Sequence, residues 1–225
     1  MVCMGFLIRV SVLIIAVAAG QVVADVQVRD ALGNMVTLPR PAERIVSLAP
    51  HLTENLFAAG AGPKLVGTVQ SCDYPPAAQQ IPRVGGHAGL DLESIVSLDP
   101  DLIVAWASGN RREDIGRLRR LGFTIYLSEP RQLDDIPDEI EKLGELAATV
   151  PTARRSARDL RSRLRQLRHR YSALRPVRIF YQLWHQPLMT VNGEQIISKA
   201  MALCGGRNIF AGLPALAPSV TVEAV

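Results

Sequence analysis

One stretch of the sequence, residues 151–174, reads PTARRSARDLRSRLRQLRHRYSAL and differs from all that surrounds it. Its apolar side chains recur at spacings of 3, 4, 3, 4 and 3: Ala157, Leu160, Leu164, Leu167, Tyr171 and Leu174. This is the period of one face of an amphipathic α-helix. A helix of about 20 residues spans about 30 Å, the width of a small domain. We therefore expect one rigid helix that joins two lobes.

Eight arginines lie between Arg154 and Arg170. They indicate either a face for nucleic acid or anionic membrane, or the solvated outer face of the helix. The net charge of the chain is only +4, although the pI is about 9.2. Aromatic residues make up 5% of the chain, which is few for a surface that stacks bases. We favour the solvated face and expect no nucleic-acid partner.

On both sides of this helix, short apolar runs alternate with amphipathic helical patterns. This order is typical of an α/β fold with mainly parallel sheets. Strands are predicted at 44–48, 65–69, 102–106, 124–127 and 177–183. Helices are predicted at 53–59 with Thr53 as N-cap, at 92–98 with Asp91 as N-cap, at 112–121, around Ile136 to Leu146, and at 194–203.

The first 24 residues have the pattern of a secretory signal peptide. Arg9 precedes the apolar run Val10 to Ala19, and the small residue Ala24 fits a cleavage site. The run is shorter than a membrane-spanning helix, and Cys3 lies ahead of it, so a lipid anchor is not expected. The predicted organisation is a signal peptide at 1–24, an N-terminal α/β lobe at 25–150, the connecting helix at 151–174 and a partial C-terminal α/β lobe at 175–225.

No catalytic motif stands out in the chain. There is no Gly-x-Ser-x-Gly, no phosphate-binding glycine loop and no dinucleotide fingerprint. His51, His87, His169 and His185 are isolated in sequence, so a structural zinc site is not expected. The pattern therefore indicates an exported binding protein rather than an enzyme.

Several ordered motifs resemble the cobalamin-binding periplasmic proteins of ABC importers, within the long-helix class of solute-binding proteins that also carries haem and ferric siderophores. In the N-terminal part they are RIVSLAPHLTE (44–54), FAAG (57–60), LVG (65–67), CDYPP (72–76), IPRVG (81–85), LDLESI (90–95) and PDLIVAW (100–106). Later in the chain they are YQLW (181–184), TVNG (190–193), LCGGRNIF (203–210) and VTVE (220–223).

The resemblance implies two α/β lobes joined by one rigid helix, with a corrinoid such as cobalamin held in the cleft between them. Cobalamin would be the transported ligand, and no intrinsic cofactor is expected. The protein would be a periplasmic monomer that hands the ligand to an inner-membrane ABC permease, and indirectly serves its ATPase. A single stiff helix would also leave the cleft largely pre-formed.

By the same resemblance, Trp106, Trp184 and Tyr74 match or adjoin ligand-facing positions. Ordinary core or loop packing is the alternative for all three. Glu93 and Glu223 match the positions at which related proteins present one carboxylate per lobe to permease arginines. For Glu93 the alternative is a first-turn glutamate that the helix dipole favours.

The sequence departs from the best-known cobalamin pattern where aromatics would flank the corrin. Ser71, His87 and Ala217 stand there instead, and we expect Ser71 and His87 to contact the ligand. His87 is a candidate axial ligand to cobalt or haem iron, and the alternative is an exposed loop histidine without a metal. His185 is a weaker candidate of the same kind.

The resemblance also predicts a second lobe that is truncated at Val225, with Cys204 unpaired unless Cys72 reaches it. Three alternatives to a corrinoid carrier stay open: a haem or ferric-siderophore carrier, a corrinoid-modifying hydrolase, and an inert fragment.

Overall fold

The first lobe is built on a four-stranded parallel sheet in the computed structural model, which describes residues 25–86 and 89–225. The strand order is β4-β3-β7-β8, and all three pairings are parallel. Its strands are β3 (Ile45–Ser47), β4 (Leu65–Thr68), β7 (Leu102–Trp106) and β8 (Ile125–Ser128). These are the four strands expected in this region, each within one or two residues of its predicted ends.

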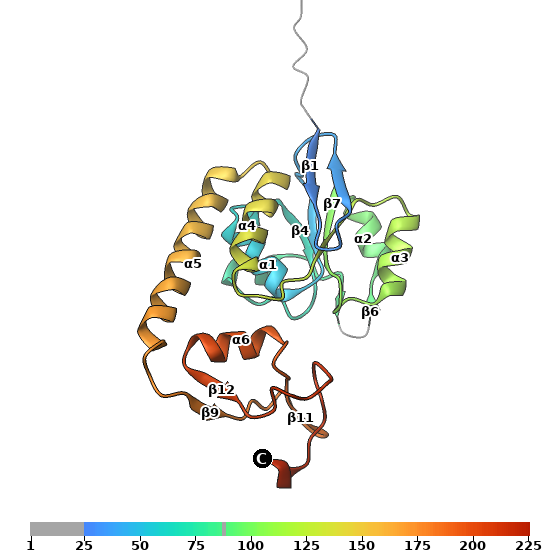
Figure 1. Cartoon of the computed structure of the whole chain (residues 1–225). Coiled ribbons are helices and arrows are strands. Elements are labelled where there is room, and N and C mark those ends of the chain that lie inside the picture. Colours follow the sequence, from blue (N-terminus) through green and yellow to red (C-terminus); the bar gives the residue numbers. More distant parts are fainter. Residues whose placement is uncertain (1–24, 87–88) are drawn as a thin grey trace, which may run out of the picture.

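Helices cover both faces of this sheet, as a parallel sheet requires. On one face lie α1 (Pro50–Ala58) and α4 (Asp135–Leu146), and on the other α2 (Leu92–Ser97) and α3 (Arg112–Arg120) (Figure 1). Alternate strand residues feed the two cores: Leu102 and Val104 pack into the first, Ile103 and Ala105 into the second. The first lobe therefore has the alternating order that the sequence predicts.

The start of α1 differs from the prediction. The helix begins at Pro50, whose fixed φ suits the first helical position, and the extended residue Ala49 precedes it. Thr53 is buried inside the helix, and its hydroxyl donates to Ser47 Oγ at 2.9 Å. The prediction of Thr53 as N-cap was wrong. Asp91, by contrast, does cap α2 and accepts the backbone N–H of Ser94 at 3.0 Å.

The sequence patterns also missed several short antiparallel pairs. β1 (Val26–Arg29) and β2 (Met35–Leu38) form a hairpin, in whose turn Asp30 accepts the N–H groups of Leu32 and Asn34. The alternation of valine with polar residues in VQVR is the signal that would have found the first of these strands. The remaining pairs are β5 (Gly85–Gly86) with β6 (Gly89–Leu90), and β10 (Trp184–His185) with β11 (Leu188–Met189).

One continuous helix, α5 (Val150–Tyr171), follows the first lobe. Its 22 residues correspond to a length of about 33 Å. It packs along α4, and Figure 1 shows it running down one side of the molecule to the C-terminal segment. Arg161 ties the two helices together through Asp138 at 2.6 Å and Glu141 at 2.8 Å. No helix in the described part of the chain is long and apolar enough to cross a membrane.

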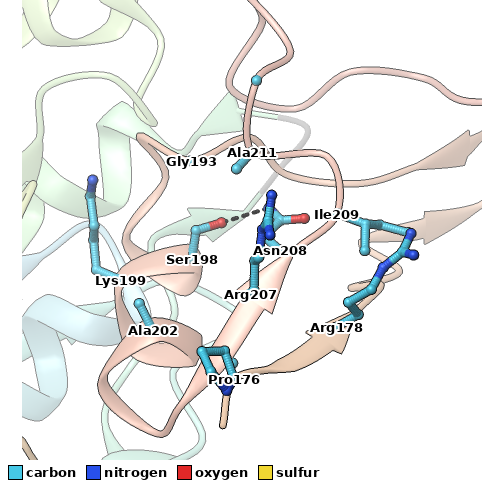
Figure 2. A pocket seen from close by; sticks show the side chains of 12 residues that line it. Pro176, Arg178, Gly193, Ser198, Lys199, Ala202, Arg207, Asn208, Ile209 and Ala211 are labelled. Atoms are coloured by element: carbon cyan, nitrogen blue, oxygen red, sulfur yellow. Dashed lines mark hydrogen bonds between the residues drawn. The ribbon is translucent and has the colours of Figure 1, made fainter. Parts of the chain in front are cut away.

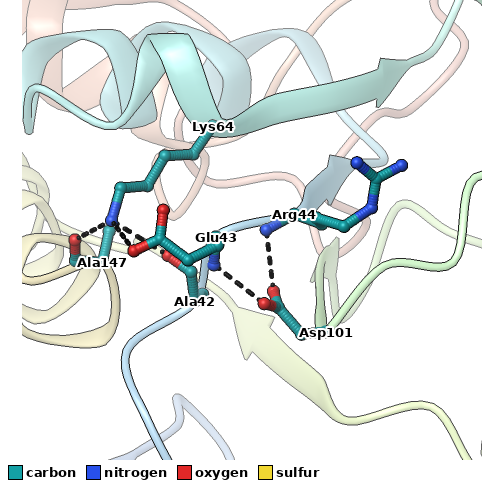
Figure 3. A network of polar contacts seen from close by, with 6 residues as sticks. All are labelled: Ala42, Glu43, Arg44, Lys64, Asp101 and Ala147. Atoms are coloured by element: carbon teal, nitrogen blue, oxygen red, sulfur yellow. Dashed lines mark hydrogen bonds and ion pairs between the residues drawn. The ribbon is translucent and has the colours of Figure 1, made fainter.

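Lys64 is at the centre of a network of polar contacts in the first lobe (Figure 3). Its ammonium donates to the carbonyl oxygens of Ala42 at 3.1 Å and Ala147 at 2.7 Å, and it pairs with Glu43 at 2.9 Å. Asp101 accepts the backbone N–H of Glu43 at 2.8 Å. Lys64 therefore joins the chain before β3 to the end of α4, and Asp101 joins that same segment to the start of β7.

The second lobe has a smaller α/β layer. The parallel pair β12 (Gly206–Asn208) and β9 (Val177–Ile179) carries α6 (Ile196–Leu203), which contacts β12. Strand β9 ends at Ile179, four residues earlier than predicted. Buried polar groups hold the layer together: Asn208 Nδ2 donates to Ser198 Oγ at 2.8 Å, and that hydroxyl donates to the Asn192 carbonyl at 2.6 Å. The molecule is thus an α/β protein of two lobes joined by one long helix.

Candidate functional site

The carboxyl edge of the parallel sheet gathers the predicted residues of the first lobe. Trp106 ends β7, and Ser71 and Tyr74 lie in the segment that follows β4. In open parallel sheets, ligands bind outside this edge because the loops there converge. Ser71 is exposed, and the Tyr74 side chain is 63% exposed, so both are accessible from solvent.

Trp106 is half-buried and has well-defined neighbours. The His51 ring, in the first turn of α1, stands edge-on to the indole, with centroids 5.1 Å apart and an interplanar angle of 86°. His51 Nε2 is buried without a hydrogen-bond partner in the described part of the chain. Burial lowers the pKa of His51, and the charge of Glu129 opposes this only in part. The imidazole is therefore neutral near pH 7 and acts as a packing surface.

Sequence reasoning missed His51, which appeared only as an isolated histidine. Its position in SLAPH, directly after a buried strand, is the signal that would have found it, because that segment also lies at the carboxyl edge of the sheet.

In the second lobe, Trp184 begins β10, and its side chain is 57% exposed. The ring of His185 lies beside it at a centroid distance of 5.6 Å. Ala217 is also exposed and lies near β11, because Ser219 forms a bridge with Met189. The indole of Trp184 therefore presents apolar surface to the solvent.

The two predicted docking acids are both exposed, one in each lobe. Glu93 lies in the first turn of α2, and Glu223 lies in the short 3-10 turn Val222–Ala224. Hydrogen bonds from its own backbone N–H and from the Thr221 hydroxyl hold the pKa of Glu223 below its usual range. Both positions place a carboxylate in solvent, where it can meet a cationic surface.

A cavity of about 630 Å³ lies in the second lobe between α6, β12 and the chain that follows (Figure 2). Arg178, Lys199 and Arg207 contribute to its lining, and no acidic residue does. None of the residues predicted to bind ligand lines this cavity. It is therefore separate from the candidate site at the carboxyl edge of the first sheet.

The predicted metal ligands are His87 and, more weakly, His185. Within 25–86 and 89–225, no group of three His, Cys, Asp or Glu side chains is placed to hold a metal ion. His87 lies outside the described residues, as does the predicted signal peptide at 1–24. Within the described residues Cys72 is buried, Cys204 is exposed, and neither forms a disulfide.

The comparisons with known proteins agree on one family. The family described as periplasmic binding protein matches residues 45–224. A vitamin B12-binding protein of Vibrio cholerae is 44% identical over 192 residues, which cover 85% of this chain and 70% of the relative. The corresponding protein of Yersinia pestis is 38% identical over 193 residues, covering 85% and 69%.

Solved structures give the same result. The crystal structure of the periplasmic vitamin B12 binding protein BtuF of Vibrio cholerae matches with a TM-score of 0.77 and 45% identity, over 81% of this chain and 72% of that one. The periplasmic heme-binding protein RhuT from Roseiflexus sp. RS-1 matches with a TM-score of 0.72 and 24% identity, over 81% and 72%. At that lower identity the match supports the fold alone.

Proposed function

This chain belongs to the periplasmic binding protein family, and we propose that it captures cobalamin or a related corrinoid and delivers it, chemically unchanged, to an ABC importer permease. The observation that carries the proposal is the 44% identity with the Vibrio cholerae vitamin B12-binding protein over 85% of this chain. A corrinoid needs broad apolar contact and a few polar groups, and no catalytic group.

We assign the ligand contacts to Trp106 and Tyr74 with Ser71 in the first lobe, and to Trp184 in the second. The exposed indole of Trp184 and the half-buried indole of Trp106 offer aromatic faces on two lobes that α5 holds apart. Each aromatic contact contributes about 1 kcal/mol beyond the area that it buries. Such faces suit a large, flat ring system.

Equilibrium binding of cyanocobalamin and of haemin to the full chain tests the proposal. We expect cyanocobalamin to bind more tightly than haemin and to be recovered unaltered by chromatography. Trp106→Ala and Trp184→Ala should each weaken binding by roughly fivefold. Leu121→Ala is the control, because Leu121 is exposed at the end of α3, near the opposite edge of the sheet.

Tighter binding of haemin would instead assign the protein to the haem carriers of the class, and conversion of the corrinoid would indicate an enzyme. His87 stays a prediction from the sequence as an axial ligand. If it ligates cobalt, His87→Ala will change the visible spectrum of bound cobalamin, and if it does not, the spectrum will be the same as in the wild type.

We propose further that Glu93 and Glu223 dock the protein on the permease. Exposed ion pairs contribute about 0–1 kcal/mol each, so their value lies in register and in steering the encounter. The variants Glu93→Lys and Glu223→Lys should bind cyanocobalamin normally but slow its transfer to permease vesicles, most strongly at low salt. Unchanged transfer by both variants would remove this assignment.

Export by cleavage after Ala24 completes the proposal. Amino-terminal sequencing of protein from the periplasmic fraction should begin at Asp25. Retention of the first residues, or recovery of the protein from the cytosol, would contradict it.

A further inference from the structure

The backbone of Gly109 lies directly against the indole of Trp106. A Cβ atom built on Gly109 would stand 1.9 Å from Cε3 and 2.3 Å from Cδ2 of the indole. Real Cβ atoms do not come this close to a carbon atom, because carbon atoms in contact lie about 3.5–4.0 Å apart. The indole therefore occupies space that any side chain at position 109 would need.

His51 bounds the same indole from another element. Its ring meets the indole edge-on at 5.1 Å, an arrangement favoured between aromatic rings. His51 Nε2 is buried and makes no hydrogen bond within the described residues, so this nitrogen does not anchor the imidazole. We call His51 and Gly109 together the indole slot.

Asn110 prevents the backbone at Gly109 from moving away. Its Oδ1 accepts the backbone N–H of Trp106 at 2.6 Å, and its Nδ2 donates to the Leu48 carbonyl at 2.9 Å. Its own N–H donates to the carbonyl of Trp106 at 3.0 Å. The turn after β7 is thus tied to itself and to the end of β3.

We propose that His51 and Gly109 are positioning residues, which set the angle at which Trp106 meets its ligand. The inference rests on the proposed function in one respect, namely that Trp106 contacts a corrinoid. The backbone φ of Gly109 lies outside the left-handed region, so alanine is compatible with the backbone there. A methyl group at this position therefore displaces the indole and leaves the turn in place.

The experiment uses Trp184→Phe as background, so that Trp106 is the sole tryptophan of the chain. In this background, Gly109→Ala should shift the emission of Trp106 to longer wavelength and weaken cyanocobalamin binding by up to roughly fivefold, the loss expected when the indole is removed. His51→Ala should shift the emission in the same direction, and it carries the test if Gly109→Ala does not fold. Gly212→Ala is the matched control, because a Cβ at Gly212 meets no atom within 4 Å and its φ is also outside the left-handed region.

A double-mutant comparison separates positioning from general damage. In a chain that carries Trp106→Ala, adding Gly109→Ala should cause no further loss of affinity, because the indole through which Gly109 acts is gone. The same loss in both backgrounds would overturn the proposal, as would unchanged emission in both slot variants. If the wild-type chain fails to bind cyanocobalamin, the proposed function fails, and the emission measurements still decide whether the slot orients Trp106.

Discussion

Gly144 of α4 lies directly against the start of α5. A Cβ on this residue would lie 2.2 Å from the Cβ of Ala153, which is fully buried at the start of α5. Ordinary carbon contacts are about 3.5 Å or longer, so Gly144→Ala must push the helices apart by roughly 1.3 Å. Neither atom is the end of a flexible side chain, so a rotamer change cannot relieve the contact.

The expected magnitude follows from two opposing effects. Overpacking of a close contact costs about 1–3 kcal/mol. Alanine stabilises a helix by up to about 1 kcal/mol relative to glycine. The free energy of unfolding of Gly144→Ala should therefore be lower than that of the wild type by about 0–2 kcal/mol. Gly116→Ala in α3 supplies the matched control, because its nearest neighbour would be Arg120 Nη1 at an ordinary 3.5 Å. That variant should be stabilised by about 0.5–1 kcal/mol.

Urea unfolding of both variants, followed by far-UV circular dichroism, gives the comparison. Both variants gain the higher helix propensity of alanine, so this gain largely cancels when the two are compared. The remaining difference is the cost of overpacking, and Gly144→Ala should be less stable than Gly116→Ala by about 1–3 kcal/mol. For a chain of this size the difference corresponds to roughly 2–4 °C in Tm per kcal/mol. A difference below about 0.5 kcal/mol would refute the tight helix contact, since independent substitutions add within that margin.

Three further predictions concern charge and thiol chemistry. Burial raises the pKa of Glu139, so the folded state holds this proton more tightly than the unfolded chain does. The free energy of unfolding should therefore fall as pH rises above 4.5, the ordinary pKa of the group. In urea unfolding Glu139→Gln should make the free energy of unfolding depend less on pH, and the same pH dependence in variant and wild type would contradict the assignment. Arg161→Met removes the ion pairs from α5 to two carboxylates of α4. It should lower the free energy of unfolding by about 0.5–1 kcal/mol at low salt and by less at high salt. A loss of stability that does not depend on salt would indicate that Arg161 acts through packing instead. Cys204 should react with a thiol reagent in the native protein while Cys72 reacts only on unfolding, and equal rates in peptide mapping would contradict their different burial.

Local patterns predicted most elements of the fold. The four central strands are apolar runs of buried residues, and the cap at Asp91 is a local hydrogen bond, so both can be inferred within a few residues of sequence. Sequence patterns predicted the wrong ends of an element where two signals lay close together. At α1, Pro50 begins the helix ahead of Thr53, and beyond Ile179 an apolar run turns instead of continuing as a strand.

The candidate site could be predicted only as a set of residues. Trp106, Tyr74 and Trp184 were identified from sequence motifs, and the structure places the first two at one edge of the parallel sheet. Their contacts were not predictable, because the neighbours of Trp106 come from α1 and from the turn after β7. His51 is 55 positions away along the chain, and no local pattern encodes such a contact.

The sequence by itself determined the long helix, the succession along the chain of the four central strands and the helices between them, and the family, because hydrophobic periods, caps and motifs are properties of neighbouring residues. Only the tertiary structure shows that Gly144 packs against Ala153 and that Gly109 packs against the Trp106 indole. It also places the His51 ring edge-on to this indole. Those contacts depend on how close separate segments come to rest in a densely packed interior, where tenths of an ångström decide whether a side chain fits.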